Sequence, residues 1–323
     1  MPRSGLGCVA AKRNAKRNEC SNRSASPGGN HGGIIVVDLR MTRHLPVLPR
    51  RATAGAIVKI LLASALTWCA GTLAAAAADL YRARTTVTGQ GETNRMTGFA
   101  ACLEDVLIKV SGAEKLAGDH RLAVYKSNAK SFVRAFSYRD QMSGTPTRDE
   151  QGTRDRPYDL TVDFEESKID DLLKALGLKP WLSQRPLVAA FVGMEQGPKK
   201  YIVTADGATS DLQRDSLRAA ADRRGMGIVL PSAAALSKSG FNAVEPMTAP
   251  SSALAPVTAE LGGEVALAGK LVWDDRKLEW ATRWQMDWHG RTHRWQVRGV
   301  TFDEAFRRAI GGAAQVLSGN GDP

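Results

Sequence analysis

Two histidines flank a short turn near the end of the chain, and these residue types are typical of a metal or acid-base site. His289 and His293 stand four positions apart, with Asp287 just before them. Structural zinc takes four protein ligands and catalytic zinc usually three, whereas the sequence offers only Asp287 as a third ligand here. We therefore predict no metal site. Acid-base chemistry is limited too, because His120 is the only other histidine after residue 78.

Acidic residues gather in one stretch of the N-terminal half, where two of them could form a catalytic pair. They first alternate with apolar residues and then stand at the start of an expected helix, where negative charge is favourable. This pattern is typical of a solvated strand face followed by a helix N-terminus. The residues are Asp155, Asp159, Asp163, Glu165, Glu166, Asp170 and Asp171.

The short motifs of common enzyme classes are missing. The sequence holds no G-x-S-x-G, H-E-x-x-H, Walker or C-x-x-C motif. The segments 89–91 and 225–227 resemble parts of phosphate loops, but neither completes G-x-G-x-x-G, and the second ends an expected helix where a phosphate site begins one. We predict no catalytic residue and no cofactor. Whether the protein is an enzyme stays open, with the sequence favouring a non-enzyme.

Five of the seven tryptophans lie between Trp273 and Trp295, and a row of indoles could bind a glycan or a peptide. They alternate on the same strand face as Leu and Val, which is typical of a core. The opposite face carries Lys270, Gln285, Asp287 and several arginines, and it either is solvated or meets an acidic partner or anionic headgroups. The candidate interaction face consists of Arg283, Arg294, Arg298, Trp288 and His289.

An uncharged run, Ile60–Ala78, follows a basic lead and ends in small residues, as a secretory signal does. We predict a signal peptide over residues 41–78, cleavage after Ala78, and periplasmic location. Two alternatives are an uncleaved inner-membrane anchor over residues 57–78 and lipid attachment at Cys69, which the bulky Trp68 disfavours. Residues 1–40 form a polar extension before the signal, which we expect to be disordered, and we expect translation to begin at Met41.

The net charge of +11 belongs mostly to the leader. Up to Lys59 there are 11 Lys or Arg and two acids, so the remaining residues carry a net charge of only +2. A nearly balanced domain lacks the dense basic face that binds nucleic acid, and we predict no such partner. After cleavage Cys102 alone remains, so no intramolecular disulfide can form, and a mature chain of this length can fold without one.

The mature chain begins with elements of an α/β domain over residues 79–180. Alternation predicts a strand over 80–88, and a period of three to four predicts a helix from Asn94 to Gly112. We expect a second helix over 122–133, a strand over 136–141, a mobile hairpin loop over 142–156, a strand over 158–165 and a helix from Ser167 to Gly177. Two prolines in 179–186 mark the domain boundary.

The second α/β domain is expected over residues 187–318, followed by a tail over 319–323. Residues 187–194 are apolar on both faces and predict a central strand. A helix from Ser210 to Arg224, with a capping box to Gln213, and a strand at 228–230 complete a β-α-β unit. Weaker helices at 232–239 and 251–261 follow. A three-stranded antiparallel meander over 265–299 and a C-terminal helix from Thr301, with a capping box to Glu304, end the domain.

Several short segments resemble a bacterial exported family, domain of unknown function 2066. The markers are Val110-Ser111-Gly112 at a helix end, Trp181 with Arg185-Pro186 before a buried strand, and Arg224-Gly225 before the next. The resemblance spans residues 79 to 317. It implies envelope export and supplies no known activity, so it assigns no catalytic residue. A looser resemblance in architecture is to small α/β domains of TolB amino termini and curli-secretion lipoproteins, which bind envelope proteins.

We therefore expect an exported, non-enzymatic periplasmic protein that binds an envelope protein or a cell-wall component. The fold class is α/β with α+β character, in two small domains. The alternative function is a periplasmic hydrolase whose site lies in the crevice between the domains. A ligand platform on the tryptophan face is a third hypothesis, and it fails if the C-terminal helix covers those rings.

Overall fold

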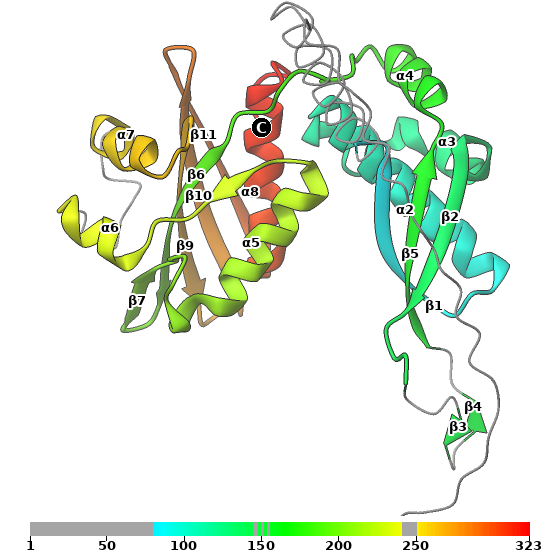
Figure 1. Ribbon diagram of the computed structural model, residues 1–323, viewed down its shortest axis with the longest axis horizontal. Coiled ribbons are helices and arrows are strands. Elements are labelled where there is room, and N and C mark those ends of the chain that lie inside the picture. The colour runs from blue at the N-terminus through cyan, green and yellow to red at the C-terminus, as the bar shows by residue number, and fades with distance from the viewer. Residues whose placement is uncertain (1–79, 145–147, 150–151, 154–155, 241–250) are drawn as a thin grey trace, which may run out of the picture. The chain divides into compact units, whose positions relative to one another are not determined.

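Three antiparallel strands and one long helix form the N-terminal part of the described chain. The structure is a computed structural model that describes residues 80–144, 148–149, 152–153, 156–240 and 251–323. Strands β1 (Arg82–Thr88), β5 (Pro157–Phe164) and β2 (Val133–Asp140) pair in the order β1-β5-β2, and helix α2 (Glu92–Ser111) packs on one face of this sheet (Figure 1). The sheet and α2 enclose the N-terminal core.

The predicted first strand and first helix are confirmed. Tyr81, Ala83 and Val87 alternate toward α2, where they join Phe99 and Leu103 in the core. Helix α2 ends at Gly112, whose φ of 73° is the left-handed conformation expected for a glycine cap.

The predicted second helix over 122–133 is wrong as a continuous helix. The chain instead forms 3₁₀ turns at His120–Leu122 and Ala129–Phe132 around a short helix α3 (Ala123–Ser127). Asn128 leaves the helical region, with φ of −116° and ψ of 28°, and β2 begins soon after at Val133. The break at Asn128 divides the predicted helix before β2 begins.

Short elements complete the N-terminal part. Strands β3 (Arg148–Asp149) and β4 (Gly152–Thr153) pair within the predicted hairpin loop, some of which lies outside the described residues. Helix α4 (Glu166–Ala175) follows β5 and buries Ile169, Leu172 and Leu173. Its N-cap is Glu165, so the helix begins at Glu166, one residue before the predicted cap Ser167.

A six-stranded sheet forms the C-terminal part. Strand β6 (Val188–Gln196) lies between β9 (Val265–Asp274), to which it is parallel, and the antiparallel edge strand β7 (Lys199–Ile202). Strand β8 (Ile228–Val229) also pairs with β6 in parallel, which completes the predicted β-α-β unit. Strands β10 (Glu279–Trp288) and β11 (Arg291–Val300) extend the sheet as an antiparallel meander, and β11 forms the other edge.

Helices cover both faces of β6. Helices α5 (Asp211–Arg224) and α8 (Phe302–Leu317) pack on the face that carries Val188, Ala190 and Val192. Helices α6 (Ala233–Lys238) and α7 (Ser251–Glu260) pack on the face that carries Ala189 and Phe191. The prediction of a central strand buried on both sides is therefore confirmed, as is the α/β class with α+β character.

The tryptophan face of the meander is core. Trp284 is fully buried, its ring centroid lies 6.3 Å from that of Phe306 in α8, and its Nε1 donates to Thr282 Oγ1 at 3.0 Å. Gly269 on β9 gives the ring its space, because a Cβ there would overlap it. Trp280 and Trp295 are buried as well. The third hypothesis, a ligand platform on this face, is removed because α8 covers it.

One of the two predicted capping boxes is wrong and the other forms only in part. Ser210 ends a 3₁₀ turn and bonds through its hydroxyl to Gly207 O, so it makes no side-chain cap with Gln213. At the start of α8, Thr301 Oγ1 accepts from the Glu304 backbone N–H at 3.3 Å. The Glu304 carboxylate does not return to the cap, since it binds Arg307 and Arg308.

The described residues have two large separate cores, one in residues 81–178 and one in 188–317. The described residues nevertheless fall within one compact unit. The division into two domains at 180–187 therefore stays a prediction. The extension over 1–40, the signal over 41–78, its cleavage site and the anchor alternative over 57–78 lie outside the described residues. None of the helices in the described part of the chain has the length and hydrophobicity that crossing a membrane requires.

The segment between the two cores has no regular secondary structure, and Arg185 fixes it in place. Its Nη1 donates to Arg224 O at 2.5 Å and its Nη2 to Lys109 O at 2.6 Å, so one guanidinium joins the C-terminal ends of α5 and α2. The guanidinium lies 4.4 Å from the Trp181 ring centroid, a cation-π contact. Burial lowers the pKa of Arg185 to about 10.

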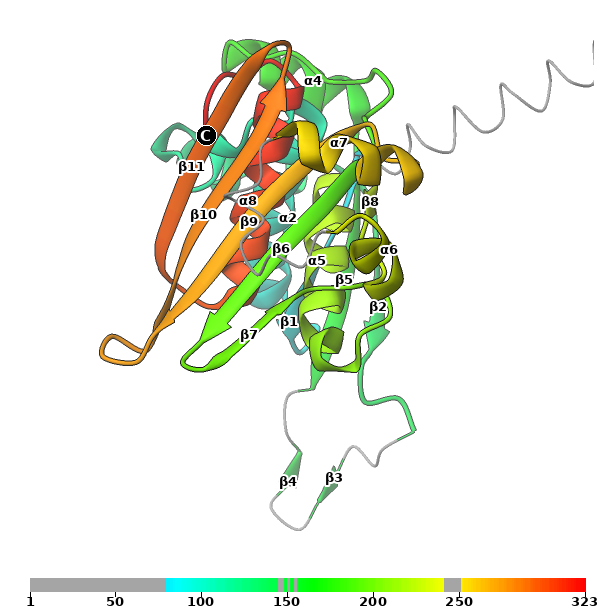
Figure 2. The ribbon, with the colours of Figure 1, turned by 90° about the vertical axis from the view of Figure 1, so that its left-hand side faces the viewer.

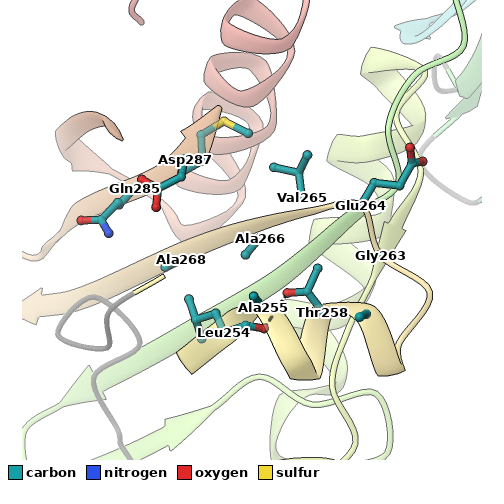
Figure 3. A pocket seen from close by; sticks show the side chains of 12 residues that line it. Leu254, Ala255, Thr258, Gly263, Glu264, Val265, Ala266, Ala268, Gln285 and Asp287 are labelled. Carbon is teal, nitrogen blue, oxygen red and sulfur yellow. Dashed lines mark hydrogen bonds between the residues drawn. The ribbon is translucent and has the colours of Figure 1, made fainter. Parts of the chain in front are cut away.

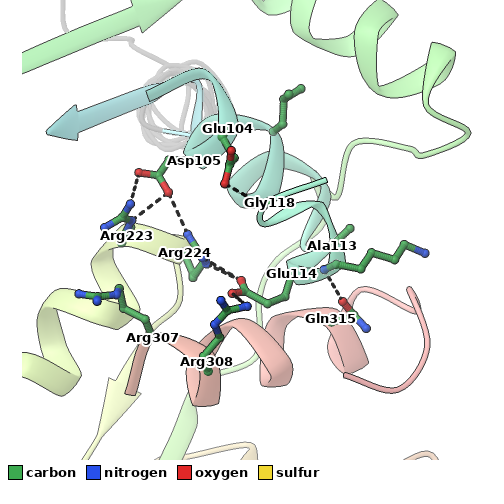
Figure 4. A network of polar contacts seen from close by, with 12 residues as sticks. Glu104, Asp105, Ala113, Glu114, Gly118, Arg223, Arg224, Arg307, Arg308 and Gln315 are labelled. Atoms are coloured by element: carbon green, nitrogen blue, oxygen red, sulfur yellow. Dashed lines mark hydrogen bonds and ion pairs between the residues drawn. The ribbon is translucent and has the colours of Figure 1, made fainter. Parts of the chain in front are cut away.

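A buried ionic cluster joins the two parts at the same place (Figure 4). Arg224, only 5% exposed, lies between two carboxylates of the N-terminal part, at 3.3 Å from Asp105 and 2.8 Å from Glu114. Arg223 also pairs with Asp105, at 2.6 Å. Burial raises the pKa of Glu114, and Arg224 opposes that rise. Each charge here is stable only because its partners are present.

Adjacent glycines let α8 approach both parts closely. A Cβ on Gly311 would overlap the Glu114 side chain, and one on Gly312 would lie 2.8 Å from the Trp295 ring. Gln315, one turn later, accepts from Lys115 N at 2.9 Å, and Asn320 Nδ2 donates to Ser111 O at 2.9 Å. The face of α8 around Gly311 thus contacts the N-terminal part, and the face around Gly312 contacts the sheet.

Replacing Arg224 with Gln should cost about 3–5 kcal/mol in the free energy of unfolding, because Glu114 would stay buried without its main counterion and Asp105 would keep only Arg223. A carboxyl whose pKa is raised by folding contributes stability at low pH and loses that contribution as the pH rises through its folded pKa. The loss in Arg224→Gln should therefore be larger at neutral than at mildly acidic pH, as urea unfolding at both pH values would measure. Arg218→Gln, an exposed position on the same helix, should change stability by no more than about 0.5 kcal/mol. Equal losses in the two variants would contradict this assignment.

Gly312→Ala should destabilise the protein by roughly 1–3 kcal/mol, because the new methyl meets a rigid indole in a packed core. In a helix without that neighbour the same change stabilises by up to about 1 kcal/mol. Thermal unfolding would measure the sign. Gly91→Ala, at the N-cap of α2 where nothing lies within 4 Å of the added Cβ, is a control without steric overlap and should cost no more than about 1 kcal/mol.

Candidate functional site

The predicted interaction residues lie on the meander, and three of them share its outer face, opposite α8. Arg283 on β10 and Arg294 and Arg298 on β11 are exposed on this side. Figure 2 shows that none of the described helices covers β10 and β11 here, whereas α7 lies over β9 and β6. We refer to Arg283, Arg294 and Arg298 as the arginine face.

Arg283 is placed opposite another cation. In the strand register it faces Lys270 on β9 and Gln296 on β11. Like charges directly across two strands are unfavourable. Lys270 is 8% exposed and is neutralised by Glu195 at 3.1 Å, and the Lys270 hydrogen bond is the largest of the effects that lower the pKa of Glu195. Arg283 makes no ion pair with any residue that the structure describes, so its charge is available to a ligand.

The other two arginines are placed by β11. Arg294 Nε donates to Gln285 Oε1 at 2.9 Å, which holds its guanidinium over β10 without neutralising it. Arg298 lies beside a shift in register between Trp280 and Thr282, opposite Ala281, and it too makes no ion pair within the described chain. The three guanidiniums can bind carboxylates or other anions through paired N–H donors.

Trp288 and His289 do not join the arginine face. Trp288 lies on the α8 side of the sheet and packs against the main core. His289 occupies the turn after it with a left-handed φ of 48°, and the two rings lie 4.4 Å apart. Both residues line a separate pocket with Arg291 and His293. The alternation of β10 places Trp288 on the same side as Trp284, which is why it points inward.

A groove lies beside the arginine face, and the sequence did not predict it (Figure 3). It has a volume of about 270 Å³ and lies between α7 and the outer face of β9 and β10. Ala266 and Ala268 line it from β9, and Leu254 lines it from α7. Gln285 and Asp287 line it from β10, next to the arginine face. The sequence signal is the pair of outward small residues on β9, but the position of α7 cannot be read from it.

The crevice between the two parts does hold titratable groups, as the hydrolase hypothesis requires. A cavity of about 470 Å³ is lined by Arg82, Arg84, Lys109, Arg223, Asp105 and Asp222. Asp105 is already engaged by two ion pairs, with Arg223 and with Arg224. No histidine lines this cavity.

The other candidate catalytic groups have structural partners. In the acidic stretch, Asp163 pairs with Arg82 at 2.6 Å, and Asp170 accepts from Tyr81 Oη at 2.8 Å. Asp159 binds Gln141 and Arg139, whose hydrogen bonds lower its pKa. Cys102 is fully buried, and burial raises the pKa of its thiol to about 12, which suits a core residue.

Of the two histidine-carboxylate pairs in the described part of the chain, only that of His293 is within hydrogen-bond distance. His293 Nδ1 lies 2.5 Å from Asp322 Oδ1, and this contact is the largest of the effects that lower the pKa of Asp322. Ser318 lines the same pocket as His293, but its hydroxyl donates to Gln315 O at 3.1 Å. His289 and His293 share this pocket without a third ligand, and within the described ranges no group of three His, Cys, Asp or Glu could hold a metal ion.

The comparison with protein families corrects the resemblance drawn from the sequence. A family model described as Domain of unknown function (DUF8605) matches residues 74–182, which is less than half of the chain. The resemblance to domain of unknown function 2066 is therefore wrong. Its markers Trp181, Arg185 and Gly225 contact one another where the N-terminal and C-terminal parts meet. Packing at this junction therefore accounts for these residue types. No curated protein matches the sequence.

Two solved structures have low similarity to the chain. The LpoB C-terminal domain from Salmonella enterica is 16% identical, covering 41% of this chain and 90% of that one, with a TM-score of 0.24. A crystal structure of an uncharacterized protein is 12% identical, covering 42% of this chain and 88% of that one, with a TM-score of 0.17. Both scores are too low to indicate a shared fold.

Proposed function

We propose that the protein is a non-enzymatic binding protein of the bacterial envelope, and that the arginine face receives an acidic segment of a partner protein. The observation that supports this most directly is the pair Arg283 and Arg298, which form no ion pair within the described chain and lie on a sheet face that none of its described helices covers. Arg283 faces Lys270, whose charge is already matched by Glu195, so the Arg283 guanidinium is open to a carboxylate of a partner.

The adjoining groove suits the same partner. Its lining of Ala266, Ala268 and Leu254 offers small apolar contacts beside the guanidiniums. A bound segment can therefore place carboxylates on the arginine face and a short apolar side chain in the groove. Charged contacts at a surface give orientation and fast association, while the apolar contact slows dissociation. We propose an envelope protein rather than a wall glycan at this face, because the face offers cationic donors.

A crosslinking experiment tests this surface. A photoreactive amino acid at Gln296, which is exposed between the arginines, should capture a partner in cells that make the protein, whereas the same group at the exposed Val124 should not. The double variant Arg283→Glu, Arg298→Glu should weaken capture at least tenfold, since each lost charged hydrogen bond contributes about 1.5–3 kcal/mol. Higher salt should also weaken capture, because it screens the contacts between charged groups.

The control carries the same change in charge at other exposed arginines, Arg134→Glu with Arg218→Glu, and should leave capture unchanged. Mass spectrometry must place the crosslink on an acidic segment of the partner. Capture that both double variants retain equally, or a crosslink to a basic segment, would reject the proposal.

Export is the second part of the proposal, and the amino terminus of the purified native protein tests it. Edman sequencing or intact mass should place the first residue at Asp79, which follows the predicted cleavage after Ala78. Retention of residues 57–78 with fractionation into the inner membrane would favour the anchor. A cytoplasmic protein that starts at Met1 would reject export.

A further inference from the structure

Strand β11 ends the six-stranded sheet, and its edge away from β10 pairs with no other strand of the described chain (Figure 2). At ten residues β11 is much longer than β7, the four-residue strand at the opposite edge of the sheet. An open edge presents backbone N–H and C=O groups that an added strand can bind. The β11 edge is therefore a surface on which a partner can bind through its backbone.

The turn before β11 shows which residues point their backbone groups outward. His289 and Gly290 form a two-residue turn with φ of 48° and 74°, as in a type I′ hairpin. The flanking residues Trp288 and Arg291 then exchange both backbone hydrogen bonds, and bonded pairs alternate with non-bonded pairs along the ladder. The backbone groups that point away from β10 therefore belong to Thr292, Arg294 and Gln296.

These three residues are available for pairing. Within the described chain, no turn, loop or side chain forms a hydrogen bond with the backbone N–H or C=O of Thr292, Arg294 or Gln296. All three are exposed, and their side chains share one face of β11 because side chains alternate along a strand. That face is the arginine face. A strand added to this edge would therefore lie directly beside the arginine face.

The space beside the edge is open. A cavity of about 330 Å³ is lined by Gln296 and Val297 of β11 and by Glu114 and Lys115 of the N-terminal part. Gln296 and Val297 point to opposite faces of the sheet, so the cavity reaches the edge itself. Val297 and Pro323 give it some apolar lining. Side chains of an added strand that point toward the α8 side would thus find a space that suits a small apolar group.

The charges of β11 decide between two occupants of this edge. A second copy could pair with it around a two-fold axis. Pairing centred on Arg294 would place the two Arg294 side chains opposite each other, and pairing centred on Gln296 would place Arg294 opposite Arg298 of the second copy. Like charges in these positions are destabilising, whereas carboxylates there are favourable. The arginines therefore favour an acidic strand over a second copy.

We propose that the acidic segment of the partner binds as a β-strand that extends the sheet at the β11 edge. This inference rests on the proposed function, and it adds the backbone conformation of the bound segment. Every second side chain of the segment is acidic and lies on the arginine face, while those between point toward the α8 side. The register shift opposite Ala281 ends the regular edge, so the added strand pairs with residues 291–297. Main-chain hydrogen bonds supply affinity, and the alternate side chains supply specificity.

Hydrogen exchange of the ¹⁵N-labelled full chain, followed by NMR, tests this geometry. Without a ligand, the amide protons of Thr292, Arg294 and Gln296 should exchange fast, whereas those of His293 and Trp295, which bond to β10, should exchange slowly. The probe is a capped heptapeptide in which Glu and Val alternate. At saturation it should slow exchange of the three outward amides at least about tenfold, because they become hydrogen-bonded. The matched peptide with Gln in place of Glu should bind at least about tenfold more weakly.

Two N-methylated forms of the Glu peptide separate strand pairing from charge attraction. In the added strand, the Glu amides and the Val amides point to opposite edges. Methylating the set that points to β11 should lower affinity at least about tenfold, and methylating the other set should leave affinity unchanged. The sensitive set is that of Glu in an antiparallel strand and that of Val in a parallel one. Equal losses in the two forms, or no loss in either, would overturn strand addition.

The outcomes separate this inference from the proposed function. A Glu peptide that binds while the three outward amides still exchange fast would overturn strand addition and leave an acidic segment on the arginine face. No binding of the Glu peptide at millimolar concentration would also overturn strand addition, and the crosslink at Gln296 would decide the proposed function by itself. Equal binding of the Gln peptide would count against both. Protection that appears without peptide and rises with protein concentration would assign the edge to a second copy, which also overturns the inference.

Discussion

The buried charge on Arg224 is the constraint on which the joining of the two parts depends. Its guanidinium compensates Asp105 and Glu114, and its carbonyl accepts from Arg185, which also holds the end of α2. Such a cluster is costly to bury and becomes more costly when one member is missing. The two parts must therefore meet in one register, because a shift of either helix end would leave a charge or a carbonyl without its partner.

Periodicity predicted most of the fold, because strands and helices with one buried face display their period in the sequence. Strand β6, α2 and the meander with α8 were predicted in this way. The helix expected over 122–133 failed because the chain leaves the helical region at Asn128, which the period of the apolar residues does not reveal. The ionic cluster could not be predicted, since Arg224 lies 119 residues from Asp105 and looks like an ordinary basic residue at a helix end.

The candidate site was predictable to a similar extent. Alternation along β10 and β11 placed the three arginines on one face, and the same alternation places Trp288 on the other. The groove depends on where α7 lies against β9, which no local pattern encodes. The unpartnered Trp295 was equally hidden, because its sequence context is that of every other core tryptophan. The sequence indicated that Trp295 is buried, but it did not indicate that the indole Nε1 lacks a hydrogen-bond partner in the described chain.

Helix α8 has a consequence for how the chain unfolds. Through Gly311 it touches Glu114 of the N-terminal part, and through Gly312 it touches Trp295 of the sheet. One helix that contacts both parts couples their stabilities, since losing it removes its contacts with Glu114 and Lys115 together with one side of the C-terminal core. We therefore expect the two described parts to unfold in one cooperative transition, with damage at this helix felt two hundred positions away.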